Sequence, residues 1–168
     1  MKFKAKISIA SVSSLLKILS IMSKHDKTII LHLLPDKTYI SSLTNLTGTK
    51  LWCKLEQKSI FLDYQFDTSN DDFDRTLLEI NVDHLINVLR KTCNAIAIKI
   101  KLSTSENDQP ILNFEITMDE CNNAAGPIII HEIPVKAIPA KFWEQLCEPD
   151  MLNHNVTQEA NSSFLAII

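Results

Sequence analysis

The chain has 168 residues, of which 45% are apolar and 22% are charged, and its formal net charge is -3. This length and composition allow the core of one sizeable domain and part of a second, and the absence of any run of about 18 uncharged apolar residues excludes a membrane span. Only two glycines occur, Gly48 and Gly126, which excludes both a G-x-G-x-x-G fingerprint and a P-loop.

The first predicted elements are a short strand and a helix in "KISIASVSSLLKILS", residues 6–20. The opening "MKFKAKISIA" has no apolar stretch of signal-peptide length, which predicts a chain that stays inside the cell. Apolar positions of the helix follow the i, i+3, i+4, i+7 rule and should face a sheet: Val12, Leu15, Leu16, Leu19 and Met22. Lys17 and Lys24 lie on the opposite side, roughly 10 Å apart.

Three strands are predicted after this helix, because apolar and polar residues alternate between turn signals. They are "TIILHLL" at 28–34, "TYISSLT" at 38–44 and "TKLWCKLE" at 49–56. One more short strand at 61–66 and an acidic loop within 63–74 lead to the next part of the chain.

The stretch "EINVDHLINVLRKTC", residues 79–93, then repeats the opening pattern. A shift of 73 positions places Ile7 over Ile80 and Lys17 over Arg90. After a loop that is four residues shorter, a shift of 69 places the strand at 28–34 over "AIAIKIKL". Two further strands follow in "PILNFEITM" and "PIIIHEIPVKAI". Each copy therefore reads as strand, helix and three strands, and the alternative is chance recurrence of apolar patterns.

The second helix is amphipathic as well. Asp83 is the predicted N-cap. The expected inner side comprises Leu85, Ile86, Leu89 and Cys93. The expected outer side comprises His84, Asn87, Arg90, Lys91 and Asn94. The first 25 residues hold five lysines and no acid, which together with the repeated cation favours a shared basic surface for a polyanion. The alternative is two solvated helix faces whose cations complement the helix macrodipoles.

No catalytic or metal-binding pattern is present. The five histidines lack the spacings of a triad or a zinc site: His25, His32, His84, His131 and His154. His32 and His131 lie in strand patterns and are interpreted as structural. The four cysteines are too widely spaced for a metal knuckle: Cys53, Cys93, Cys121 and Cys147. Buried free thiols are favoured over a disulfide or zinc framework. We expect no catalysis, no cofactor and no metal.

Four segments carry a resemblance to a known family: "MKFKAKI", "LWCKLEQKSIF", "LRKTCNAIAIKIKL" and "IIHEIPVKAIPAKFWEQLCEP". Together they resemble the hydroxyurea-sensitivity (Hus) subunits of the nine-one-one checkpoint clamp, within the PCNA-like sliding-clamp family. The resemblance covers nearly all of residues 1–149. It implies an α+β fold, with two β-α-β-β-β repeats and both helices on one face of antiparallel sheets.

The same resemblance implies a function. Such subunits form a nuclear heterotrimeric ring with Rad-nine-type and Rad-one-type subunits, which a clamp loader places on double-stranded DNA at damage sites to recruit checkpoint and repair proteins. The repeated helices would line the hole, and their cations would meet phosphates without reading sequence: Lys17, Lys24, Arg90 and Lys91.

A subunit seam is expected at one strand. Pro134 has no N–H to offer a ladder, which indicates an edge strand, and in the clamp family the corresponding strand pairs with a neighbouring subunit. The candidate seam residues are Ile128, Ile129, Ile130, His131, Glu132, Ile133, Val135 and Lys136. A solvated edge is the alternative. Phe142 and Trp143 would lie at the start of the connector between the family's two domains.

The chain departs from the family pattern after residue 150. We expect a clamp domain at 1–138, the start of a connector at 139–150 and a divergent tail at 151–168, with the second clamp domain absent. The edge of "TKLWCKLE" would then lack a partner and promote self-association. A fragment, a splice form and a natural short form all remain open.

Three hypotheses follow from these observations. The chain is a clamp subunit, or an interaction-only short form that competes for one partner without closing a ring, or a small hydrolase or ligand-binding α+β protein. Co-purification with the partner subunits separates the third from the other two.

Overall fold

A computed structural model of the chain describes residues 2–43, 49–67, 75–119, 125–143, 146 and 163–167. The predicted turn at 45–48, most of the acidic loop and the residues Cys121, Cys147 and His154 lie outside these ranges. Within the ranges, no helix is long and apolar enough to cross a membrane.

The element order contains the predicted duplication. The first copy comprises β1 (Lys2–Ile7), α1 (Ile9–His25), β2 (Thr28–Leu33), β3 (Thr38–Ser42) and β4 (Thr49–Leu55). A short helix α2 (Gln57–Ile60) and strand β5 (Phe61–Asp67) form the bridge. The second copy comprises β6 (Thr76–Asn81), α3 (Val82–Arg90), β7 (Ala95–Thr104), β8 (Pro110–Asp119) and β9 (Ala125–Ala137). A 3-10 turn η1 (Ala140–Phe142) and strand β10 (Ser163–Ile167) follow.

The two copies complete each other's sheets. Strand β1 of the first copy pairs with β7 of the second, with Ile7 opposite Ile98. Strand β6 of the second copy pairs with β2 of the first, with Ile80 opposite Ile29. Ile7 and Ile80 are equivalent positions of the two copies, and so are Ile29 and Ile98. The two ladders therefore join the same pair of positions, once in each direction between the copies. The register therefore supports duplication over chance recurrence.

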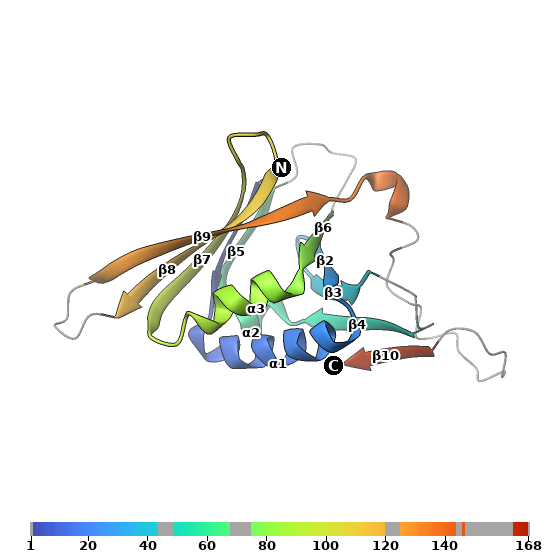
Figure 1. Cartoon of the computed structure of the whole chain (residues 1–168), viewed down its shortest axis with the longest axis horizontal. Coiled ribbons are helices and arrows are strands. Elements are labelled where there is room, and N and C mark those ends of the chain that lie inside the picture. The colour runs from blue at the N-terminus through green and yellow to red at the C-terminus, as the bar shows by residue number, and fades with distance from the viewer. Residues whose placement is uncertain are drawn as a thin grey trace.

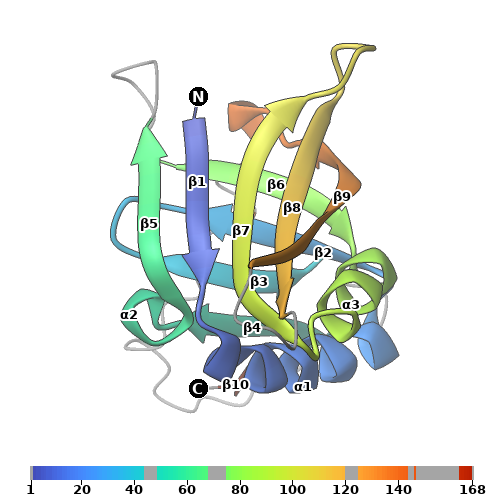
Figure 2. The ribbon, with the colours of Figure 1, turned by 90° about the vertical axis from the view of Figure 1, so that its left-hand side faces the viewer.

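The strands form one ten-stranded sheet in the order β10-β4-β3-β2-β6-β9-β8-β7-β1-β5. We call β5, β1, β7 and β8 the first half-sheet, and β6, β2, β3 and β4 the second. Figure 1 shows the half-sheets on either side of the molecule, with α1 and α3 together along one margin, and Figure 2 shows the first half-sheet from its own side. The predicted α+β clamp-like architecture is confirmed.

Strand β9 joins the half-sheets. It pairs with β8 as far as Pro134, which lies opposite Ile111, and from Val135 onward it pairs with β6. Proline is tolerated at the point where a strand changes partner, because its missing N–H interrupts neither ladder. In the first copy the corresponding stretch is divided into strand β4, helix α2 and strand β5. Strand β4 belongs to the second half-sheet, and β5 pairs with β1 of the first.

The core lies between the half-sheets and the two helices. Four of the five predicted inner residues of α1 are buried, with Leu19 and Met22 at most 1% exposed, and Leu16 is partly buried. On α3, Ile86 and Leu89 are buried, but the helix ends at Arg90 and Cys93 is exposed beyond it. The prediction for Cys93 was therefore wrong. Cys53 is buried as expected.

The N-cap of α3 also differs from the prediction. The side chain of Asn81 accepts hydrogen bonds from the backbone N–H groups of Asp83 (2.9 Å) and His84 (3.4 Å). Asp83 instead lies in the first turn, where its charge faces the positive end of the helix dipole. The cap therefore lies two residues earlier than predicted, at the last residue of β6.

The expectation of an open edge at β4 was wrong. Strand β10 pairs with β4 in parallel, from Ser163 opposite Thr49 to Ile167 opposite Cys53. Figure 1 shows β10 alongside β4 near the C-terminal end of the chain. The tail thus supplies a neighbour for the strand that was expected to lack one.

Candidate nucleic-acid interface

The helices α1 and α3 expose polar and charged side chains next to each other, although Ile9 and Ile21 of α1 are also exposed. They contact each other and lie at the same margin of the molecule (Figure 1). Because each buries its apolar stripe in the core, the opposite stripes face outward. All four predicted DNA-facing cations are exposed: Lys17, Lys24, Arg90 and Lys91. We call this surface the helix face.

The charge of the helix face is mostly positive. Helix α1 has no acidic residue, and Asp83 is the one acid of α3. None of the four cations makes an ion pair with a residue that the structure describes. Lys24 and Arg90 lie in the last turns of their helices, where the macrodipole alone favours a cation. Lys17 is in the middle of α1, so the dipole does not account for it.

Three lysines that were counted toward this surface lie elsewhere. Lys2, Lys4 and Lys6 are exposed on β1, while the alternate residues of the strand are buried in the core. They therefore project from the far side of the first half-sheet. The lysine-rich N-terminus does not add to the helix face, and this part of the charge argument from sequence was wrong.

The outer side of the first half-sheet carries a second group of cations, which the sequence analysis missed. Lys4 lies opposite Lys101 and Lys6 opposite Lys99 in the β1–β7 ladder. Acids neighbour this group, since Lys99 is 3.8 Å from Glu115 and Lys6 lies opposite Asp63. The surface is therefore a mixed-charge face. The alternation of lysines with apolar residues in the segments of β1 and β7 was the sequence signal that could have revealed this group of cations.

The candidate seam lies partly on an open backbone edge. From Ile128 to Ile133, β9 pairs with β8 on one side, and its other side has no partner among the strands described. Ile128 and Ile130 are exposed by 62% and 59%. Val135 and Lys136, by contrast, pair with Ile80 and Glu79 of β6. Their backbones are engaged within the chain, so the open segment is shorter than the predicted one.

His131 connects the seam with the helix face. Its side chain is partly buried, and burial followed by the nearby charge of Lys91 lowers the pKa of the imidazole. The cation at the end of α3 is thus close enough to β9 to influence it electrostatically.

The two connector aromatics differ in their surroundings. The indole Nε1 of Trp143 donates a 2.7 Å hydrogen bond to the carbonyl of Ile138, and the guanidinium of Arg75 lies 5.5 Å from the centre of the indole ring. Phe142 is 43% exposed. Trp143 therefore anchors the segment that follows β9, where the connector is predicted to start, to the end of that strand, and Phe142 is exposed.

His32 belongs to a buried aromatic cluster. Its Nε2 lies 2.9 Å from the hydroxyl of Ser41, and its ring centre is 4.7 Å from that of Trp52. Burial, followed by the charges of Lys50 and Arg75, lowers the pKa of His32 from 6.5 to about 3. The imidazole is neutral at physiological pH, which agrees with the structural interpretation of this residue.

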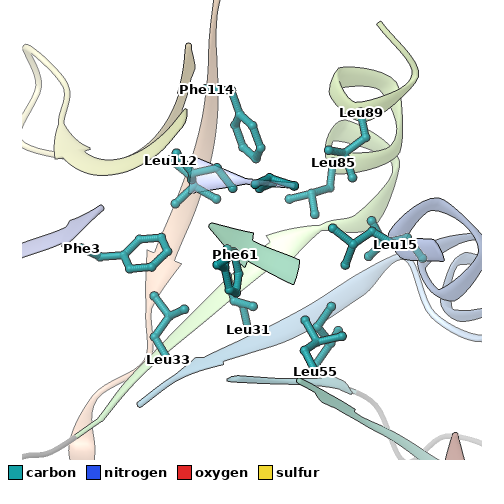
Figure 3. A pocket seen from close by; sticks show the side chains of 14 residues that line it. Phe3, Leu15, Leu31, Leu33, Leu55, Phe61, Leu85, Leu89, Leu112 and Phe114 are labelled. Carbon is teal, nitrogen blue, oxygen red and sulfur yellow. The ribbon is translucent and has the colours of Figure 1, made fainter. Parts of the chain in front are cut away.

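A small apolar cavity lies in the core. It measures about 50 Å³ and is lined by apolar side chains from both half-sheets, from the bridge and from both helices. Figure 3 shows these side chains pointing toward one another, with Phe114 opposite Leu85 and Leu89. Engineered apolar cavities that bind small ligands measure about 150 Å³, so this one is too small for such a ligand. In the described part of the chain, no three His, Cys, Asp or Glu residues could hold a metal ion together.

Comparisons with known proteins show what this chain is similar to. The model of a family described as Hus1-like protein matches residues 1–157. The chain is 32% identical over 152 residues to "Checkpoint protein HUS1" of Homo sapiens, which covers 89% of this chain and 53% of that protein. It is 28% identical over 150 residues to "Checkpoint protein hus1" of Schizosaccharomyces pombe, covering 89% of this chain and 50% of that protein. The match to "Checkpoint protein hus1 homolog" of Dictyostelium discoideum is 28% over 153 residues, or 90% of this chain and 54% of that protein. The chain spans about half the length of these curated relatives.

Proposed function

Because this chain belongs to the Hus1-like family, we propose that it acts in the nucleus as a subunit of a checkpoint sliding clamp. The clamp would be a heterotrimeric ring with Rad-nine-type and Rad-one-type subunits. A clamp loader would place it on double-stranded DNA at damage sites, where it would recruit checkpoint and repair proteins. The proposal contains no catalytic step.

The observation that carries the proposal is the helix face. Two equivalent helices lie side by side, and equivalent positions of the two copies, Lys17 and Arg90, hold exposed cations. Phosphates are the partner that suits such a surface, because exposed lysine and arginine attract a regular row of negative charges and read no bases. The binding would be weak and independent of sequence, as suits a subunit whose ring is held on DNA by its topology.

The test is the salt dependence of binding to double-stranded DNA at low ionic strength. If Lys17, Lys24, Arg90 and Lys91 each neutralise one phosphate, the logarithm of the binding constant should fall with the logarithm of salt concentration with a slope of roughly 3 to 4. The double variant Lys17→Ala, Arg90→Ala should lower that slope by about 2, since each lost contact removes about 0.9. Two unrelated DNA sequences should give the same result.

A matched control uses the mixed-charge outer face of the first half-sheet. Lys4 and Lys101 lie opposite each other on the outer side of the first half-sheet and are exposed. The variant Lys4→Ala, Lys101→Ala removes the same amount of charge and should leave the slope unchanged. If the control lowers the slope as much as the helix variant does, net charge explains the binding and the proposed DNA face is wrong.

A further inference from the structure

Strand β4 has the character of an interior strand. Four of its side chains are at most 7% exposed: Leu51, Trp52, Cys53 and Leu55. Its pairing with β3 accounts for one side of the backbone. Leu51, Cys53 and Leu55 share one buried face, whereas on the other face Trp52 is buried between the partly exposed Lys50 and the exposed Lys54. Unpaired N–H and C=O groups beside this apolar surface readily pair with another chain, so the outer side of β4 suits a further strand.

The neighbour comes from the tail. Residues 163–167, "SFLAI", pair with Thr49–Cys53 in parallel, whereas every other ladder of the described strands is antiparallel. The segment has no charge, no glycine and no proline, so all of its backbone N–H groups are available. It also lies beyond residue 157, where the match to the family model ends. The strand on this edge is thus outside the family match.

We propose that the outer side of β4 is a strand-binding site and that residues 163–167 are its resident occupant, which keeps a second copy of this chain from pairing there. A five-residue parallel pairing is weak by itself. Its attachment to the same chain gives the tail an effective concentration on the order of millimolar, which favours it over a second copy at micromolar concentration. This inference does not depend on the proposed clamp function.

The direction of the backbone groups makes the site testable. The N–H of Leu51 donates a 3.0 Å hydrogen bond to the hydroxyl of Ser42 on β3. Because successive N–H groups of a strand point to opposite sides, the N–H groups of Lys50 and Trp52 point toward β10. Deleting residues 163–168 should therefore make the Lys50 and Trp52 amides exchange with solvent faster, at low micromolar protein concentration. The Leu51 amide should stay protected and serves as the internal control.

The same deletion should change the oligomeric state. Light scattering at tens of micromolar should find the whole chain monomeric and the shortened chain self-associated, with protection of Trp52 returning as its concentration rises. Equal exchange at Lys50 and Trp52 in both proteins would overturn the proposal, and so would a shortened chain that stays monomeric.

Two proline variants test the pairing without shortening the chain. Phe164→Pro and Leu165→Pro remove neighbouring N–H groups that point to opposite sides of β10, so one of them faces β4 and the other faces away. One variant should behave like the deletion and the other like the unaltered chain. Equal behaviour of the two variants would contradict strand pairing, because the loss would then not depend on which side of the strand is altered.

Discussion

At the scale of single residues, His32 should make the stability of the protein depend on pH. Its pKa is about 3 in the folded chain against 6.5 for an ordinary histidine. Below pH 6.5 the unfolded chain therefore binds a proton that the folded chain does not. His32 should lower the free energy of unfolding by about 1.4 kcal/mol for each pH unit between roughly 6 and 4, and this loss should be absent above pH 7.

Urea unfolding at a series of pH values, followed by tryptophan fluorescence, measures this dependence. The comparison is with His32→Asn, which keeps a hydrogen-bonding side chain near Ser41 but does not titrate. The variant should be less stable at pH 7, because it loses the ring contact with Trp52, and its stability should fall less steeply toward pH 4. Parallel curves for the two proteins would show that carboxylates, and not His32, cause the acid sensitivity.

Other residue placements show where inference from sequence fails. The buried positions of α1 followed from helical spacing, because a long helix repeats its apolar signal several times. Cys93 was misplaced because α3 ends at Arg90, and a spacing rule has no information about where a helix stops. Lys2, Lys4 and Lys6 were assigned to the wrong surface, since alternation separates the two sides of a strand without showing which side the helices occupy.

At the scale of elements, α3 offers a direct test of its cap. Asn81→Ala removes the oxygen that accepts from two backbone N–H groups and should cost about 1 kcal/mol of the free energy of unfolding. Asn87 is exposed within the same helix, and Asn87→Ala should be neutral or slightly stabilising because alanine is the better helix former. Urea unfolding of both variants checks the difference. A larger cost at Asn87 would argue against the assigned cap.

The two sets of strands were predictable to different degrees. The strands of both copies could be recognised because each carries an apolar pattern between turn residues, and the copies support each other. Strand β10 could not be recognised in this way. Its pairing with β4 joins positions more than one hundred residues apart, and its five residues are too few for a periodic signal. The segment of the candidate seam was correctly predicted to be a strand, but the partner change at Pro134 depends on tertiary structure.

At the scale of the whole molecule, the proposed seam predicts how the subunit assembles. Ile128→Lys together with Ile130→Lys places two charges on the open edge of β9, where the native side chains are already mostly exposed. Folding should be unaffected, and co-purification with the partner subunits should be lost because edge lysines oppose strand addition. Leu62→Lys is the control, since Leu62 is 66% exposed on β5, the strand at the far end of the sheet.

Pull-down of the purified subunits measures this outcome. If Leu62→Lys abolishes association and the β9 variant does not, the contact between subunits lies on β5 and the proposed seam is wrong. Retention on circular DNA, compared with linear DNA, then shows whether an assembled ring has closed around the double helix.

The pairing of β4 with β10 has a consequence for the newly made chain on the ribosome. Leu55 is synthesised more than one hundred residues before Ser163. At a synthesis rate of about 5–20 residues per second, β4 waits roughly 5–20 s for its own tail. During that interval neighbouring nascent chains on one messenger RNA expose the same strand to each other. Chaperones that cover extended apolar segments would therefore be needed most while the second copy is being translated.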